Sequence, residues 1–412
     1  MRFKSILLFI LFILIIFLFA SCGINETIDE TDIPIISESD YFSADIINKT
    51  GNSVRFKETI PFTQAYPDSN VIDLTNLKKP REDAQVICVD NVGNIYYVAE
   101  RGENHSTGSI FSYNYSNKSW KTLVETSENH NCTVVCVNEN YLLWREDDNA
   151  NWLKVTLHLL DLKTKKSVKI YDYSTDPNTV LMYSWQFSTP VIIGDNVYFD
   201  DIVGKDKNEL YDIKMYSYSI TQKKINTLDE DAKWPMEFQG EAAWLKMSSD
   251  KKNSLFYSAK QEKFLLKTEA RLGTAFTSRK NIVVANDYMS QAFFDHLTTK
   301  SSLQSDFIDS VNDPAISSYG IKLYKKNQIR PIIVVNTGFI TNPVTNGDLI
   351  GWYGSSVGKP LIYSSRKDIL IEFDQLGLEN VLAYDFKLSD NYLILSCATE
   401  NNDQYVYMFD LE

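Results

Sequence analysis

The chain has 412 residues, enough for two or three ordinary domains or for one large repeat domain. Its 54 acidic side chains outnumber the 41 basic ones and give a net charge of −13. This charge argues against nucleic-acid binding, because the chain would repel phosphate groups. Tyr and Phe are abundant, with 24 and 22 copies, and β-branched residues crowd short runs, a composition that favours an all-β fold.

The N-terminus has the pattern of an export signal. Arg2 and Lys4 precede an uninterrupted apolar run from Ile6 to Ala20, which is followed by Ser21 and Cys22. As a helix this run spans only about 22 Å, short of the roughly 30 Å hydrocarbon core of a bilayer. A cleaved signal covering residues 1–22 is therefore favoured over a permanent transmembrane anchor.

The stretch LFASC resembles the lipobox of bacterial lipoproteins, in which the cysteine after the small residues is lipidated before cleavage. Cys22 is the matching position, although Phe19 stands where the family usually has Leu. The resemblance implies a palmitate-carrying protein at the cell membrane, facing the extracytoplasmic side; a plain secretory signal or an uncleaved anchor is the alternative. Membrane contact is expected through the lipid and not through a basic patch, because the chain is acidic.

Residues 23–69 are polar and acidic without a sustained period, and predict a flexible tether. Behind them, short apolar runs of five to eight residues alternate with clusters of Asp, Asn, Gly and Lys. This texture indicates a many-stranded all-β domain over residues 70–412.

One short phrase recurs seven times in that domain: a turn rich in Asn, Asp or Gly, followed at once by an apolar, aromatic-rich strand. Most repeats are spaced by the length of a four-stranded antiparallel sheet, which can bury both of its faces only when similar sheets flank it. We therefore predict a seven-bladed β-propeller of four-stranded antiparallel blades. In this respect the chain resembles TolB-like and other bacterial propeller lipoproteins, without a subfamily motif that would transfer functional residues.

Three further features refine this architecture. LFYSAKQEKFLL from Leu255 and LIYSSRKDILIE from Leu361 repeat each other, and predict the third strand, turn and outer strand of two blades, with Lys260 and Arg366 in the turns. The last blade lacks a strand, which we expect Asn70–Asn76 to supply from the other end of the domain, removing an exposed edge. Residues 289–318 interrupt the fifth blade, and their apolar spacing predicts a short helical insertion.

No motif predicts catalysis or metal binding. GSSVG at Gly354–Gly358 matches the nucleophile elbow in form, but it lies in a loop between strands, without the strand–turn–helix that strains the serine. The stretch from Asp147 lacks the glycine and the glutamate of a calcium loop, and the four histidines lack metal spacing. Cys132 and Cys136 lie about 13 Å apart along one strand and cannot pair with each other. We expect no catalytic residue, metal or cofactor.

The long loops of the propeller are expected on one face, where they join second to third strands and successive blades. They are charged and aromatic, whereas the hairpins of the opposite face are minimal. The candidate binding rim on the long-loop face consists of Arg145, Asp147, Trp185, Asp201, Trp234 and Tyr353. The alternative for Trp185 and Trp234 is packing between blades.

These features predict a monomeric, non-catalytic scaffold that binds an envelope protein, a peptide or a glycan. The alternative is a propeller enzyme, a polysaccharide lyase or glycosidase, that uses paired carboxylates such as Asp200, Asp201 and Asp147. Hydrolysis needs two carboxyl groups about 5–9.5 Å apart. Carboxylates that converge at the channel mouth would favour the enzyme, and scattered ones would favour binding.

Overall fold

The computed structural model describes residues 48–50, 53–55, 59–101, 105–148, 155–173, 189–205, 211–248, 253–269, 275–288, 319–325, 328–335, 340–355, 360–373, 376–377, 381–399, 401 and 403–411. All of them belong to one compact unit, Ile35–Glu412. Cys22, Trp185 and the insertion at 289–318 lie outside the described residues. Within the described ranges, no helix has the length and apolarity to cross a bilayer.

Four sheets each contain four antiparallel strands in chain order. The first sheet comprises β5 (Gln85–Val89), β6 (Asn94–Ala99), β7 (Ser109–Asn114) and β8 (Ser119–Glu125). The second comprises β9 (His130–Val137), β10 (Tyr141–Asp148), β11 (Val155–Asp161) and β12 (Ser167–Asp172). The third comprises β13 (Val191–Ile193), β14 (Asn196–Lys205), β15 (Tyr211–Ser219) and β16 (Lys224–Glu230). The fourth comprises β17 (Ala232–Phe238), β18 (Glu241–Met247), β19 (Asn253–Ser258) and β20 (Lys263–Glu269).

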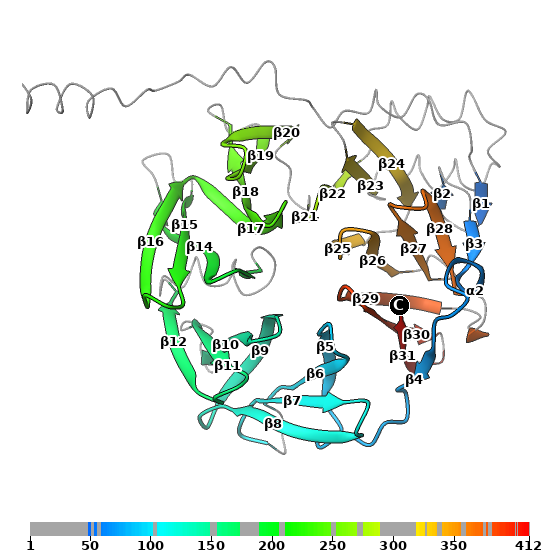
Figure 1. Cartoon of the computed structure of the whole chain (residues 1–412), viewed down its shortest axis with the longest axis horizontal. Helices are drawn as coiled ribbons and strands as arrows, with labels where there is room; N and C mark the ends of the chain where they lie inside the picture. Colours follow the sequence, from blue (N-terminus) through cyan, green and yellow to red (C-terminus); the bar gives the residue numbers. More distant parts are fainter. Residues whose placement is uncertain are drawn as a thin grey trace, which may run out of the picture. The chain divides into compact units, whose positions relative to one another are not determined.

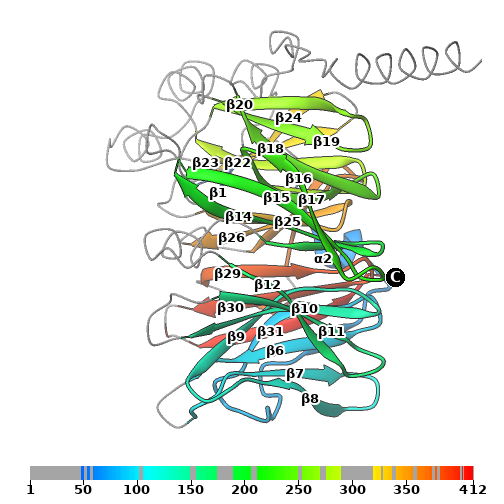
Figure 2. The ribbon, with the colours of Figure 1, turned by 90° about the vertical axis from the view of Figure 1, so that its left-hand side faces the viewer.

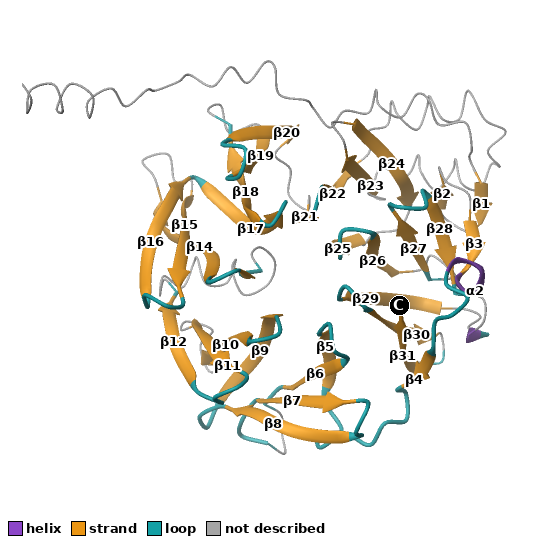
Figure 3. Cartoon of the chain, viewed as in Figure 1, coloured by secondary structure: helices purple, strands orange, loops and turns teal. Residues whose placement is uncertain are grey.

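Two larger sheets follow, and both gain strands from the N-terminal part of the domain. The six-stranded sheet comprises β21 (Ala275–Arg279), β22 (Ile282–Tyr288), β23 (Tyr319–Lys325) and β24 (Gln328–Val335), extended by β2 (Ser53–Arg55) and β1 (Asn48–Thr50). The nine-stranded sheet comprises β25 (Ile340–Thr345), β26 (Leu349–Ser355), β27 (Leu361–Ser364), β28 (Ile369–Glu372), β29 (Val381–Leu388), β30 (Tyr392–Thr399), β31 (Gln404–Asp410), β3 (Thr59–Pro61) and β4 (Val71–Asp73). The short helix α2 (Phe62–Ala65) follows β3. Figure 3 shows how strands dominate the described residues.

Apolar side chains on both faces of the sheets pack consecutive sheets together. Leu142 and Leu143 are neighbours on β10 and point to opposite faces, so Leu142 packs with the first sheet and Leu143 with the third. The chain of contacts closes where Ile95 of β6 shares a cluster with Ile394 of β30 and Met408 of β31. The sheets therefore surround a central axis, as Figure 1 shows, and the fold is an all-β propeller.

The closing strand lies where the sequence predicts it. The short strand β4 falls inside Asn70–Asn76 and pairs antiparallel with β31, with Ile72 opposite Met408. The backbone N–H of Asp410 also donates to the carbonyl oxygen of Asn70 at 3.1 Å. The predicted ring closure is thus confirmed, and it covers the edge of β31.

The duplicated segments also have the predicted roles. They form β19, β20 and the turn between them, and β27, β28 and the equivalent turn. In the first turn the N–H of Gln261 donates to Ser258 Oγ, and in the second the N–H of Lys367 donates to Ser364 Oγ, at 3.3 and 3.2 Å. A serine at the equivalent position therefore closes the turn in both copies.

Part of the predicted tether has regular structure. Strands β1, β2 and β3 and helix α2 lie within residues 48–65, and β2 and β3 pair with the outer strands β24 and β28. β3 lies at the edge of its sheet, whereas β2 lies between β24 and the edge strand β1. The ordered part of the domain thus begins upstream of residue 70.

Deleting residues 70–77 tests the closure. We expect the melting temperature to fall by several degrees, because the deletion exposes the edge of β31 and uncovers Met408. Circular dichroism melts measure the change. Deletion of residues 48–55 is the matched control, since it removes edge strands from the six-stranded sheet without opening the ring; a melt that responds equally to both deletions would contradict this role of β4.

Candidate functional site

A cavity of about 380 Å³ lies where β29–β31 face the first sheet, and we call it the seam cavity. Its lining includes the starts of β5, β29 and β31 and the ends of β26 and β30. These strand ends lie on the side of the sheets that carries the connections from second to third strands. The seam cavity therefore opens on the face predicted to bind ligand, and Tyr353 of the predicted rim is part of its lining.

Four tyrosines give the seam cavity its aromatic character. Tyr97 and Tyr384 are buried, and Tyr353 and Tyr405 are partly exposed. Gly354 allows the close approach of Tyr384 to β26, since a Cβ atom there would lie 2.5 Å from the tyrosine ring. Aromatic walls with polar tips can stack on a ligand and hydrogen-bond to it.

Polar groups are interspersed with these rings. Gln85 and Gln404 contribute amides, and Lys79 Nζ donates to the carbonyl oxygen of Ala84 at 2.6 Å. Asp385 is the one carboxylate among the described lining residues, and Lys387 Nζ lies 2.5 Å from its Oδ2. The arrangement is suited to orienting a neutral polar ligand.

The thiol of Cys397 also belongs to the lining. Its side chain is buried, and burial raises the pKa of the thiol to about 12. Because the thiolate is the nucleophilic form, this cysteine stays unreactive at neutral pH.

Three of the predicted rim residues lie between the second and third sheets and not in the seam cavity. Arg145 and Asp147, two residues apart on β10, share the face toward β14. The Arg145 guanidinium lies 5.4 Å from the ring centroid of Tyr173, and Tyr171 Oη donates to Asp201 Oδ2 at 2.8 Å. Asp201 is only 3 % exposed, so its carboxylate serves the packing of these two sheets.

Trp234 lies near the start of β17, with its backbone N–H toward the third sheet and its ring packed against the six-stranded sheet. Its backbone N–H donates to Asp200 Oδ2 at 3.1 Å, its φ of 58° is left-handed, and Lys233 Nζ lies 4.9 Å from its ring centroid. The ring also contacts Phe276 of β21, at 6.4 Å between centroids. These contacts correspond to the packing alternative for Trp234. Burial lowers the pKa of Lys233, and the nearby Asp200 carboxylate opposes this.

A cluster of one carboxylate and two histidines, on β9, β10 and β11, was not predicted from the sequence. On β10, Glu146 lies opposite Cys132 of β9 and Thr156 of β11, so His130 and His158 are its diagonal neighbours. Its Oε1 is 2.8 Å from His130 Nδ1 and its Oε2 is 3.4 Å from His158 Nε2. To find this cluster from sequence, one must know which residues of neighbouring strands lie opposite each other. Bulges in the β9–β10 and β11–β12 pairings shift this register. Among the described residues, no three ligand side chains are arranged to hold a metal ion.

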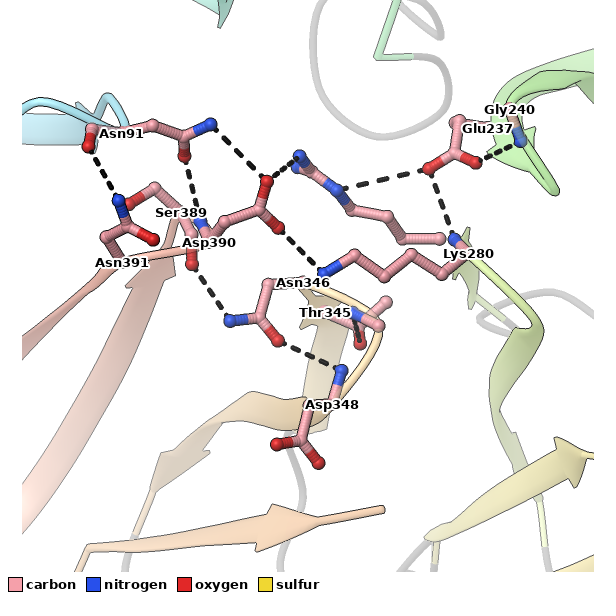
Figure 4. Close-up of polar contacts among 12 residues, drawn as sticks. Asn91, Glu237, Gly240, Lys280, Thr345, Asn346, Asp348, Ser389, Asp390 and Asn391 are labelled. Carbon is pink, nitrogen blue, oxygen red and sulfur yellow. Dashed lines mark hydrogen bonds and ion pairs between the residues drawn. The ribbon is translucent and has the colours of Figure 1, made fainter. Parts of the chain in front are cut away.

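A polar network joins short hairpins on the opposite face of the ring (Figure 4). Asp390, on the turn after β29, accepts hydrogen bonds at Oδ2 from Arg279 Nη2 at 3.2 Å and from Asn91 Nδ2 at 3.3 Å. Lys280 Nζ lies 3.0 Å from its Oδ1. Although burial opposes ionisation, Arg279 and Lys280 hold the pKa of Asp390 below its usual range. One carboxylate thus ties together hairpins of the first, six-stranded and nine-stranded sheets.

Glu237 extends this network to the fourth sheet. Its carboxylate accepts hydrogen bonds from the backbone N–H of Lys280 at 3.2 Å and of Gly240 at 2.7 Å. Its Oε2 also lies 3.9 Å from Arg279 Nε. Gly240, Arg279, Lys280 and Asp390 lie in the repeated turn phrases and Glu237 lies just before one, but sequence alone does not show that these turns meet.

No family model matches the sequence, and no curated protein matches it significantly. The β-propeller domain of the Trilobed protease from Pyrococcus furiosus is similar in structure, with 10% identity and a TM-score of 0.40 over 81% of this chain and 83% of that chain. TolB from Acinetobacter baumannii has 11% identity and a TM-score of 0.35 over 77% of this chain and 64% of its own. A prolyl endopeptidase has 9% identity and a TM-score of 0.46 over 80% of this chain and 50% of its own. These likenesses assign no activity to this chain.

Glu146→Gln tests the histidine–carboxylate cluster through pH. The hydrogen bond from His158, and to a smaller extent that from His130, lowers the pKa of Glu146 from the ordinary 4.5 to about 2, although burial opposes this. The ionised carboxylate therefore stabilises the fold above its unfolded pKa, and this contribution is lost as the pH falls from about 5 to about 2. We expect the substitution to cost about 1 kcal/mol at neutral pH, allowing for solvent screening, and to flatten the acid limb of the stability curve.

Chemical denaturation at several pH values measures this effect. Glu128→Gln, which removes an exposed carboxylate, is the control and should leave the acid limb unchanged. Parallel stability curves for wild type and Glu146→Gln would show that the histidines do not stabilise the ionised carboxylate.

Proposed function

We propose that this protein is a non-catalytic binding scaffold, lipid-anchored through Cys22 on the extracytoplasmic side of the cell membrane, that holds a peptide or glycan in the seam cavity. The observation that carries the proposal is the cavity itself. Its volume of about 380 Å³ is in the range of small-ligand sites, and its tyrosines and amides match the stacking and hydrogen bonding that sugars and peptides need.

We further propose that the ring has seven blades, as in TolB-like propellers. This count divides the nine-stranded sheet into β25–β28 and β29–β31 with β4. The start of β26 pairs with β27 through Leu349–Ser364 and Ile350–Tyr363, and its end pairs with β29 through Gly354–Tyr384 and Ser355–Ala383. This divergence along β26 supports two blades that touch only at the end of the strand.

The carboxylates favour the scaffold over the enzyme. Asp200 and Asp201 are adjacent on β14 and point to opposite faces, one to the N–H of Trp234 and the other to Tyr171. Both are nearly inaccessible, at 1 % and 3 % exposure. Hydrolysis of a glycosidic bond needs two carboxyl groups, one as acid and one as base or nucleophile. Asp385 is the one carboxylate among the described residues that line the seam cavity.

Tyr353→Ala tests the seam cavity. In screens of the full chain against immobilised glycans and peptides, we expect binding to weaken about tenfold, or ~1.4 kcal/mol, because a stacking surface is lost. Tyr115→Ala is the control, since Tyr115 is exposed on a turn at the opposite face. Equal effects of the two substitutions, or no binding to either ligand class, would contradict the proposed site.

Cys22→Ala tests the lipid anchor. Radiolabelled palmitate supplied to cells should label the wild-type protein and not the variant, because the thiol of Cys22 is the expected attachment point for the lipid that anchors the chain. Labelling is measured on immunoprecipitated protein, with Cys136→Ala as the control. Equal labelling of all three proteins would remove the lipoprotein assignment.

A further inference from the structure

Exposed basic residues collect on the outer turns of one face. The hairpin face is the face that carries the turns between first and second and between third and fourth strands; Figure 2 shows the sheets edge-on, with the C-terminus of β31 at this face. The turns between third and fourth strands hold, or directly precede, these exposed cations: Lys118, Lys163, Lys165, Lys166, Lys223, Lys224, Lys260, Lys263, Arg366 and Lys367. They come from five turns distributed around the ring.

Most of these cations have no acidic partner in the described part of the chain. Arg366 Nε lies 3.7 Å from Asp348 Oδ2, and Lys260 Nζ donates to the carbonyl oxygen of Gln239. Seven lysines make no ion pair with any described residue: Lys118, Lys163, Lys165, Lys166, Lys223, Lys224 and Lys263. Their ammonium groups are therefore available to a partner.

Three of these lysines occupy a backbone conformation that does not favour lysine. Lys118, Lys165 and Lys223 stand at φ of 54°, 61° and 52°, the left-handed region in which Gly or Asn is preferred. We call them the turn lysines. Three successive sheets thus place an exposed cation in this left-handed conformation, whereas the corresponding turns of the fourth and nine-stranded sheets place Glu262 and Asp368 there, at φ of 50° and 59°.

Several acidic residues of the hairpin face are engaged within the protein, whereas Glu139, Glu241 and Glu262 are exposed on its turns. Asp161 accepts the backbone N–H groups of Lys163 and Thr164 at 2.9 and 2.8 Å, and Asp90 accepts those of Val92 and Asn94. Asp390 is held in the network of Figure 4. Seven lysines without an ion pair among the described residues thus stand against three exposed glutamates, so the balance of exposed charge on this face is positive, although the whole chain carries −13.

We propose that the hairpin face docks on an anionic lipid bilayer through its lysines. The cations lie on separate turns around the ring and not in one cavity, so a small anion could meet only one group of them, whereas a planar anionic surface meets them together. Each basic residue near such a surface strengthens binding roughly fivefold at low salt. The docking would leave the opposite face, with the seam cavity, directed away from the bilayer. The proposal depends on neither the seam cavity nor the lipid at Cys22.

Lysine acetylation of the full chain, read by mass spectrometry, tests the docking. The probes are vesicles of phosphatidylcholine alone and of phosphatidylcholine with phosphatidylglycerol. Lys78, Lys214 and Lys246, near the opposite face, are the control lysines. We expect the anionic vesicles to slow acetylation of the turn lysines about fivefold or more, high salt to reverse the effect, and the control lysines to react equally with both vesicles. Equal acetylation of the turn lysines, or equal protection of both sets, would overturn the proposal.

Two variants that each lose three lysines, and that both keep the N-terminal segment, separate the effect of the turn lysines from that of the segment. The turn variant replaces all three turn lysines by Asn, which tolerates the left-handed conformation; the control variant replaces the three control lysines by Gln. Relative to wild type, we expect the turn variant to partition roughly 100-fold less into anionic vesicles and the control variant to change little. Equal losses would show that only net charge matters. Protection by soluble polyglutamate but not by vesicles would overturn the bilayer in favour of an anionic polymer.

Discussion

The architecture depends on one constraint: each sheet is apolar on both faces, and each face must be covered. Leu142 and Leu143 of β10 show it at the scale of adjacent residues, because they pack against different sheets. A linear stack would leave its two ends exposed to water, with a large cost in buried apolar surface. Closing the stack on itself removes both ends, and β4 then covers the edge of β31 at the joint.

The seam cavity lies beside this joint. The connection from β4 to β5 and the ends of β26 and β30 enclose the seam cavity beside the closing strand. Elsewhere, the residues expected to face a ligand are used for packing: Asp201 holds Tyr171, and the N–H of Trp234 donates to Asp200. On the opposite face, Asp390 and its cationic partners join hairpins of different sheets. The two faces of the ring thus differ in both shape and charge.

The strand pattern, the closing strand and the duplicated turns followed from sequence because they depend on local periodicity and on turn chemistry, which short segments already contain. Tyr353 was assigned to the correct face because strand order implies the side on which each loop lies. The roles of Arg145, Asp201 and Trp234 could not be predicted, since a one-residue difference on a strand decides whether a side chain meets solvent or the neighbouring sheet. The cluster of His130, Glu146 and His158 required a register that bulges make unpredictable.

By itself the sequence determined the class of fold, the strands, the partner of β31 and the net charge. These are properties of the local pattern or of the composition, and they do not depend on which strand ends meet in space. Only the tertiary structure decided where the charge lies. On the hairpin face Asp161 accepts turn N–H groups and Asp390 pairs with Arg279 and Lys280, while Lys118, Lys165 and Lys223 remain exposed. When the ring closes, residues at the same ends of different strands lie on one face, even when they are far apart in the chain. The same closure decides that Tyr97, Tyr353 and Tyr405 line one cavity.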